Sequence, residues 1–209
     1  MLLEVNATRM ELLRLKKRLV LARRGHKLLK DKEDELMRQF LDLVHKNRDL
    51  RERLETQLIA AFKNFLMARA AMDRESMEEA IMFPKQKLDL SVSTTPIMNL
   101  RVPRFELRYE GTVHSYGFIN TSAELDSALQ MYSDLLPEMV KLAETESTVQ
   151  LLADEIEKTR RRVNALEYVL IPDLEETINY IAMRLNEMER SNITRLMKIK
   201  EIAQSEKLL

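Results

Sequence analysis

The chain has 209 residues, and its 34 Lys and Arg residues balance 34 Asp and Glu residues, so the formal net charge is zero. It contains only 3 Gly and 5 Pro, and it has no Cys or Trp. So few turn-forming residues argue against sandwiches, barrels, propellers and doubly wound sheets. The lack of Cys excludes a disulfide scaffold, a Cys-ligated zinc site and cysteine catalysis.

The ends and the hydropathy of the chain predict a soluble, cytosolic protein. The N-terminus lacks the charged, apolar and small-residue zones of a signal peptide. No stretch approaches the roughly 18 consecutive apolar residues of a membrane-spanning helix. Hydrophobic residues make up 45% of the chain and recur periodically, so disorder is not expected.

The first arm, residues 1–83, is predicted to form one long helix from about residue 8 to Phe83. It contains no Pro and one Gly. Its apolar residues recur at alternating spacings of three and four, which is typical of a coiled coil. From Gln57 the register drifts toward a broader apolar face that includes Ile59 and Phe62. The predicted core residues of this arm are Leu12, Leu15, Leu19, Leu29, Leu36, Phe40, Leu43, Leu50 and Leu54.

The middle segment, residues 84–121, holds three of the five Pro and two of the three Gly. Apolar residues alternate with polar ones from Leu88 to Val92 and from Phe105 to Tyr109, a pattern typical of strands. Pro96 and Pro103 bracket the run between them, and proline restricts strands to sheet edges. We predict a small β-hairpin-like cap, and we expect the helical arms to fold without it.

The third arm, residues 122–209, is predicted to be helical again. Thr121 and Glu124 have the spacing of a capping box. Pro137 and Pro172 should each kink the helix or start a new segment, because proline removes a backbone donor and clashes with the preceding turn. The predicted core residues of this arm are Val149, Ile156, Val163, Ile178, Ile181, Leu185 and Ile199.

Two helical arms of similar length around a compact middle predict an all-α dominated fold, an antiparallel intramolecular coiled coil with a small cap. The two termini would lie together at one end, and the cap toward the other. Neither arm alone can bury its apolar stripe, so pairing must supply most of the stability. His26, Glu33 and Asn47 interrupt the stripe and should help to fix its register.

Charge is distributed unevenly along the predicted coil. Residues 1–30 carry nine bases and two acids, whereas residues 124–157 carry nine acids and one base. An antiparallel arrangement would place a basic tip at one end and an acidic half toward the other. Such a molecule can engage a different partner at each end, with electrostatics setting the orientation.

The candidate chemistry is sparse, and we expect no catalytic residues, no cofactor and no metal. His26, His45 and His114 lack ligand spacing, which favours packing or solvent roles. No glycine-rich loop could hold a nucleotide phosphate. Carboxylates on helices without a pocket are typical of solvated faces. Gly25 is either a tolerated surface residue or a point of close approach by another helix or a partner.

The basic run from Arg14 to Lys30 allows three interpretations: a nucleic-acid contact, a solvated face, or a protein-binding tip. Its layout resembles that of a zipper-type DNA binder. However, the leucine stripe passes through the basic run itself, so that this segment is already paired. No aromatic residues accompany it for stacking on bases. These features favour the protein-binding tip.

Two long motifs carry a family resemblance. The stretch VNATRMELLRLKKRL at 5–19, followed by ARRGHKLLKDK at 22–32, is similar to the opening of the D subunit of the V-type and A-type ATP synthases. The run RRVNALEYVLIP at 161–172 is similar to the C-terminal signature of the same family. Ala7 stands where many members have proline, a departure that affects only the first turn.

The resemblance implies a rotor-shaft subunit of the central stalk, with no active site of its own. Its paired terminal helices would enter a catalytic ring of A and B subunits, an F subunit would bind its side, and a socket subunit, C or d, would hold its lower end. It would be peripheral to the cytoplasmic side of the membrane and would couple ATP synthesis or hydrolysis to proton or sodium translocation. A free-standing coiled-coil adaptor or a nucleic-acid-binding rod is the alternative.

The predicted ring contacts are the basic residues at the tip of the coil. Rotation of an asymmetric shaft would present a different face to each catalytic interface in turn, which couples the sites through differential contacts. The residues assigned to this surface are Arg14, Lys17, Arg18, Arg24, Lys27, Arg195, Lys198 and Lys200.

Overall fold

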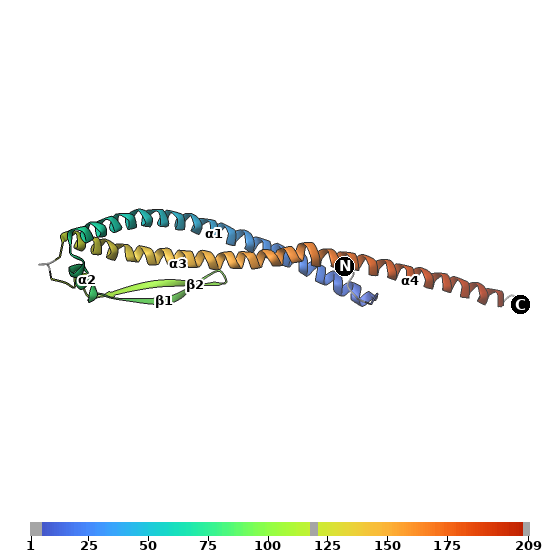
Figure 1. The fold of residues 1–209 in the computed structure, drawn as a ribbon. Coiled ribbons are helices and arrows are strands. Elements are labelled where there is room, and N and C mark those ends of the chain that lie inside the picture. The colour runs from blue at the N-terminus through green and yellow to red at the C-terminus, as the bar shows by residue number, and fades with distance from the viewer. Residues whose placement is uncertain (1–5, 118–120, 207–209) are drawn as a thin grey trace. The chain divides into compact units, whose positions relative to one another are not determined.

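A computed structural model describes residues 6–117 and 121–206 (Figure 1). Long helices dominate it, and its one described sheet has two strands, which confirms the predicted fold class. The elements in chain order are α1 (Arg9–Ala71), α2 (Arg74–Met82), β1 (Lys87–Ile97), β2 (Leu100–Glu110), α3 (Ala123–Ala165), the π-helical segment η1 (Leu166–Leu170) and α4 (Ile171–Glu206).

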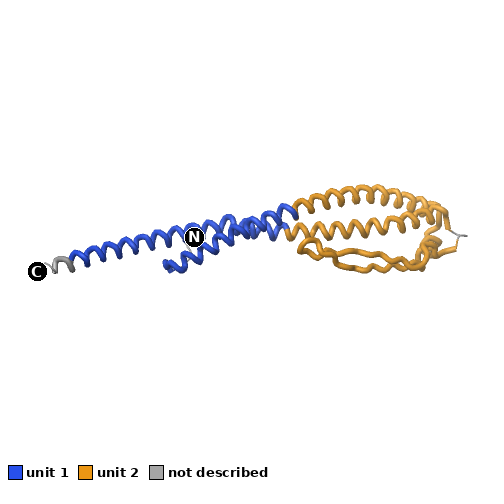
Figure 2. The backbone as a smooth tube through the Cα atoms, turned by 180° about the vertical axis from the view of Figure 1, so that it is seen from behind, with its two compact units in different colours: residues 1–35, 156–209 blue, residues 36–155 orange. Residues whose placement is uncertain are grey.

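The chain divides into two compact units, coloured separately in Figure 2. Unit 1 comprises residues 1–35 and 156–209, and unit 2 comprises residues 36–155. Each unit combines a stretch of α1 with a helical stretch from the second half of the chain. These boundaries cut across the three segments that the sequence suggested, because both arms contribute to both units.

In unit 1, α1 packs antiparallel against α4. Leu15 and Ala22 of α1 form a buried cluster with Leu174, Ile178 and Ile181 of α4. Leu174 and Ile181 are fully buried, and burying one such side chain contributes about 1.5–3 kcal/mol. This cluster supplies the apolar seam that neither helix could form alone.

In unit 2, α1 approaches α3 through small residues. Leu54, Ala61 and Ala68 follow one another at heptad spacing on α1, and all three are buried. Ala128 of α3 is also fully buried. Small side chains allow two helices to pack closely. The apolar face predicted around Ile59 and Phe62 is therefore not the seam, since the alanines take that position.

The predicted single helix to Phe83 is wrong, because α1 ends at Ala71 and α2 begins at Arg74. Asp73 between them has the extended backbone of an N-cap, with ψ of 147°, and its carbonyl oxygen accepts a bond from the N–H of Met77. Met77 and Ala80 of α2 then pack against Ala68 and Leu125 in a second buried cluster. This long-range packing redirects the chain although the break contains neither Gly nor Pro.

The prolines in the helical arm behave differently from each other. Pro137 lies inside α3, which continues to Ala165. Pro172 is the second residue of α4 and follows closely on the π-helical segment η1, so a change of helix type accompanies it. A wider π turn is one of the ways in which a helix accommodates a local disturbance of its hydrogen-bond ladder.

The predicted capping box at Thr121 is also wrong. α3 begins at Ala123, so Thr121 lies one residue too early to be its N-cap. The Thr121 hydroxyl instead donates to the carbonyl oxygen of Gly117, and the N–H of Leu125 donates to the carbonyl oxygen of Ser122.

Strands β1 and β2 form an antiparallel ribbon, defined here as Lys87–Glu110. Val92 lies opposite Phe105 in its register. Pro103 lies inside β2 rather than at the boundary of a third run, which corrects the predicted strand limits. At the turn, Met98 has a positive φ of 53°, a conformation that non-glycine residues seldom adopt.

Candidate interaction surfaces

The predicted contact residues of α1 form an exposed basic surface in unit 1. Lys17, Arg18, Arg24 and Lys27 are all exposed. Arg14 is exposed as well and lies 3.7 Å from the carboxylate of Glu11 on the same helix. The helical spacing of these residues distributes positive charge along several turns of α1, away from the buried seam.

The predicted contact residues of α4 form a second, separate basic group. Arg195 and Lys200 are exposed, and Lys198 is 3.1 Å from Glu201. Arg9 pairs with Glu189 and Arg23 with Glu175 of α4, so about 16 Å of helix separates the level of Arg14 from that of Arg195, and about 30 Å separates the level of Arg23 from it. The structure therefore does not bring the eight predicted residues together into one patch.

The far end of α4 lies beyond the level at which α1 begins. Arg9, the first residue of α1, donates to Glu189 at 2.5 Å. Past this level, α4 exposes large apolar side chains. Four of them are between 54% and 65% exposed: Ile193, Leu196, Met197 and Ile199.

Ile199 was predicted as a core residue, and at 61% exposed it is not one in the isolated chain. The heptad pattern continues in α4 past the point where the described part of α1 can cover it. An apolar stripe with no covering helix is typical of a protein-binding surface. A groove of about 760 Å³ adjoins this region and is lined by residues that include Thr8, Glu187 and Arg195.

The other predicted core residues lie on the inner faces of the helices with different degrees of burial. Buried residues are Leu15, Leu36, Leu54, Ile156, Val163, Ile178 and Ile181. Half-buried residues are Leu12, Leu19, Leu29, Phe40, Leu43, Leu50, Val149 and Leu185.

A further apolar surface lies on the outside of α1 in unit 2, on the broader apolar face that the sequence predicted from Gln57 onward. Ile59, Phe62 and Leu66 follow helical spacing and are 57%, 54% and 45% exposed. The burial of the smaller Ala61 and Ala68 on the same helix explains why these three residues face outward.

The histidines and Gly25 hold positions that the sequence left open. His26 lies 3.2 Å from Glu167 of η1, a contact within unit 1. A Cβ added at Gly25 would meet no atom within 4 Å. No described helix of unit 1 therefore approaches Gly25 closely, which leaves a surface glycine or a contact with a partner.

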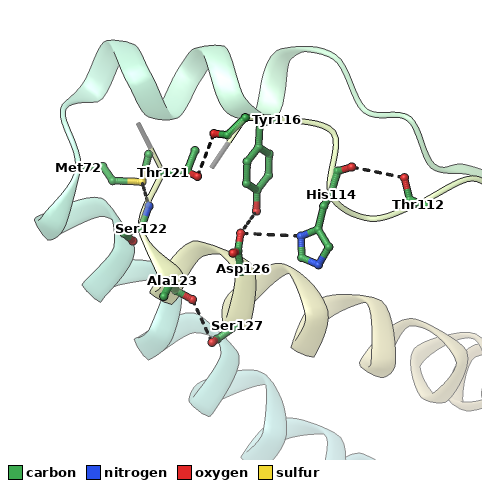
Figure 3. A network of polar contacts seen from close by, with 10 residues as sticks. Met72, Thr112, His114, Tyr116, Thr121, Ser122, Ala123, Asp126 and Ser127 are labelled. Carbon is green, nitrogen blue, oxygen red and sulfur yellow. Dashed lines mark hydrogen bonds and ion pairs between the residues drawn. The ribbon is translucent and has the colours of Figure 1, made fainter. Parts of the chain in front are cut away.

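A polar network fastens the segment after the ribbon to the first turns of α3 (Figure 3). The Tyr116 hydroxyl donates to the Asp126 carboxylate at 2.6 Å, and His114 Nδ1 lies 3.8 Å from the same carboxylate. Burial raises the pKa of Tyr116, and the hydrogen bond and negative charge of Asp126 raise it further. The tyrosine stays protonated and keeps donating at neutral pH.

Within residues 6–117 and 121–206, no group of three or more His, Cys, Asp or Glu is placed to hold a metal ion. In the same residues, no helix is both long and apolar enough to cross a membrane. Antiparallel helix pairing, a two-stranded β-ribbon and exposed basic and apolar side chains define the class: a coiled-coil protein with exposed surfaces of charge and hydrophobicity.

Comparison with known proteins identifies the family within this class. The family model for the ATP synthase D subunit matches residues 11–201. The chain is 58% identical over 203 residues to the V-type ATP synthase D subunit of Thermoanaerobacter sp. (strain X514), covering 96% of this chain and 97% of that protein. It is 55% identical over 209 residues to the same subunit of Clostridium novyi, covering 98% and 97%. The chain therefore belongs to the D-subunit family of the ATP synthases.

Proposed function

We propose that this chain is the central rotor shaft of a rotary V/A-type ATP synthase. The observation that carries the proposal is the nearly full-length match to the V-type ATP synthase D subunit, from residue 11 to residue 201. The antiparallel α1–α4 pair of unit 1 supports it, because a shaft that transmits torque needs two helices held in one register.

The shaft couples two processes that take place in other subunits. ATP is made or hydrolysed by a ring of A and B subunits, and protons or sodium ions cross the membrane elsewhere in the complex. The shaft itself is non-catalytic, needs no cofactor, and lies peripherally on the cytoplasmic side. Its contribution is conformational: as it turns, its asymmetric surface favours a different state at each catalytic interface.

The ring contacts lie in unit 1. The basic residues of α1 from Arg14 to Lys27 form one contact surface, and Arg195, Lys198 and Lys200 of α4 form another. The apolar residues around Leu196 on α4 reinforce the second surface, since their exposure in the isolated chain would end on insertion into a protein ring.

An F subunit and a socket subunit, C or d, complete the set of partners. The exposed stripe of Ile59, Phe62 and Leu66 in unit 2 offers an apolar face to the F subunit. A stripe with this helical spacing fits the mode in which an amphipathic helix packs onto a neighbour.

Co-purification tests the proposal. An affinity-tagged copy of the full chain, expressed with the other subunits, should retain A, B and F through washes of increasing salt. Recovery of nucleic acid that is released by salt, with no A or B subunit, would contradict it and would indicate the nucleic-acid-binding rod instead.

A further inference from the structure

The apolar stripe of the second helical arm changes phase at η1 in unit 1. Buried residues before η1 are Ile156, Thr159 and Val163, and buried residues after it include Leu174, Ile178 and Ile181. Each set recurs at spacings of three and four, but eleven residues separate Val163 from Leu174. Continued from Val163 in the same alternation, the first pattern would reach Asp173 and Tyr180. These positions each lie one residue before a fully buried side chain.

The burial of the residues in α4 follows the displaced pattern. Leu174 and Ile181 are fully buried, whereas Asp173 is half-buried and Tyr180 is 44% exposed. Thr177 is buried as well, and its hydroxyl donates to the carbonyl oxygen of Asp173. The stripe of α4 is therefore shifted by one residue relative to the stripe that leads into η1.

The facing stripe on α1 contains no such step. Leu15, Ala22 and Leu29 follow one another at intervals of seven, and α1 is α-helical throughout Arg9–Ala71. Two paired helices keep their apolar stripes facing each other only where their repeats match. The second arm thus has one residue more than α1 at this level.

The extra residue is taken up within η1. The N–H of Ile171 donates to the carbonyl oxygen of Leu166, five residues earlier, whereas an α-helical bond spans four residues. A π turn therefore holds one residue more than an α turn. Proline by itself does not require such a turn, because α3 continues as an α-helix through Pro137.

The π turn lies where the apolar stripe has least to lose. No residue of η1 is buried, and Tyr168 and Val169 are 71% and 57% exposed. The stripe position on α1 at this level is His26, which lies 3.2 Å from Glu167 of η1. An extra residue here displaces no buried apolar side chain.

We propose that η1 is a register insertion, a π turn that stores one extra residue and so brings the apolar stripe of α4 into phase with α1. The insertion also sets the direction in which the rest of α4 faces, because one residue of an α-helix corresponds to a rotation of about 100°. The exposed apolar residues around Leu196 are oriented accordingly. This device is a property of the chain alone and does not rest on the rotor-shaft function.

Single-residue deletions in the isolated full-length chain test the insertion. Both deletions are made in the Pro172→Ala chain, because a proline in the α-helix that replaces η1 would clash with the preceding turn. Deleting Val169 restores the alternation of three and four, so the melting temperature should stay within about 3 °C of the Pro172→Ala chain or rise above it.

Deleting Tyr180, another exposed residue of the same arm, is the matched control. This deletion turns Ile181 about 100° away from the apolar seam and should lower the melting temperature by about 5–15 °C. Equal losses in the two deletion variants, or failure of the Val169 deletion variant to fold, would overturn the proposal.

The crystal structure of the Pro172→Ala chain separates the insertion from the proline as the cause of the π turn. The extra residue is still present in this chain, so the bond from the N–H of Ile171 to the carbonyl oxygen of Leu166 should persist. A regular α-helix through residues 166–171 would show that the proline causes the turn, and would overturn the proposal.

Cross-linking tests whether α4 keeps its alignment with α1. The chain has no Cys, so two introduced thiols can be joined uniquely by a short bis-maleimide. The pairs are Arg23→Cys with Glu175→Cys, and Arg9→Cys with Glu189→Cys. After deletion of Val169, both pairs should cross-link at the yield of the undeleted chain. After deletion of Tyr180, only the pair at 23 and 175 should do so. Loss of either cross-link on deletion of Val169 would overturn the proposal, since α4 would then have moved along α1.

Discussion

Arg23 on α1 donates a hydrogen bond to Glu175 on α4 at 2.6 Å, although 152 residues separate them in the chain. Arg9 and Glu189 make the equivalent contact at 2.5 Å. Fourteen residues separate Arg9 from Arg23, and fourteen separate Glu175 from Glu189, which is two heptads on each helix. The two pairs mark one antiparallel register along unit 1.

The ion pair of Arg23 and Glu175 should help to set the register of α1 and α4 and should add little to the free energy of unfolding. Both side chains are largely solvated, at 62% and 42% exposed, and exposed pairs contribute about 0.2–1 kcal/mol. A double-mutant cycle with Arg23→Ala and Glu175→Ala, measured by urea unfolding, should give a coupling free energy below about 1 kcal/mol. A coupling above about 2 kcal/mol would show that the pair is a main source of stability.

The apolar seam of unit 1 should carry the stability instead. Leu174 is fully buried, and Leu174→Ala should lower the free energy of unfolding by about 2–5 kcal/mol. Leu21 is 70% exposed, so Leu21→Ala should change it by less than about 0.5 kcal/mol. Equal effects in urea unfolding would contradict the assignment of the α1–α4 seam as the core of this unit.

Much of this fold could be predicted from the sequence, because the heptad stripe of large apolar residues signals helix pairing directly. The part of the unit 2 seam beyond Leu54 could not, since Ala61 and Ala68 carry a weaker hydrophobic signal than the neighbouring Ile59 and Phe62. The break at Asp73 was also missed, because it depends on packing against Leu125, about fifty residues away. The assignment of the basic residues to partner contacts stays a prediction, and their division into two groups could not be predicted because it depends on helix alignment.

Tyr116 should make the free energy of unfolding fall as the pH rises into the alkaline range. Its pKa is raised in the folded state, by burial and by Asp126, above the value of about 10 for an unfolded tyrosine. Below about pH 10 its contribution is fully present. Above that value the unfolded state loses the proton first, so the folded state loses stability as the pH rises.

Comparison with Tyr116→Phe isolates this contribution. The variant should be less stable by about 1 kcal/mol at about pH 8, because one hydrogen bond is lost. In urea-unfolding series, the difference in free energy of unfolding between the wild type and this variant should narrow as the pH rises above about 10. Tyr168→Phe, at an exposed ring, is the control and should alter stability little below that pH. If the difference in free energy of unfolding between the wild type and Tyr116→Phe widened with pH, the predicted direction of the pH dependence would be wrong.

The basic surface of α1 should contribute to assembly. Replacing Arg14, Lys17, Arg18, Arg24 and Lys27 together by Gln should weaken retention of A and B subunits and lower ATP-driven ion pumping, because complementary charge is lost at the contact. The matched control replaces five exposed bases of α1 in unit 2 by Gln: Lys46, Arg48, Arg53, Lys63 and Arg69. Unchanged assembly and pumping in the first variant would refute the contact assignment.

Rotation of this chain within the assembled complex tests the central claim most directly. The substitution Ser91→Cys, at an exposed position, provides a unique attachment point for a bead, since the chain has no other Cys. With the A and B ring fixed to a surface, addition of ATP should make the bead turn in one direction. A bead that stays stationary while the same complexes hydrolyse ATP would contradict the rotor-shaft function.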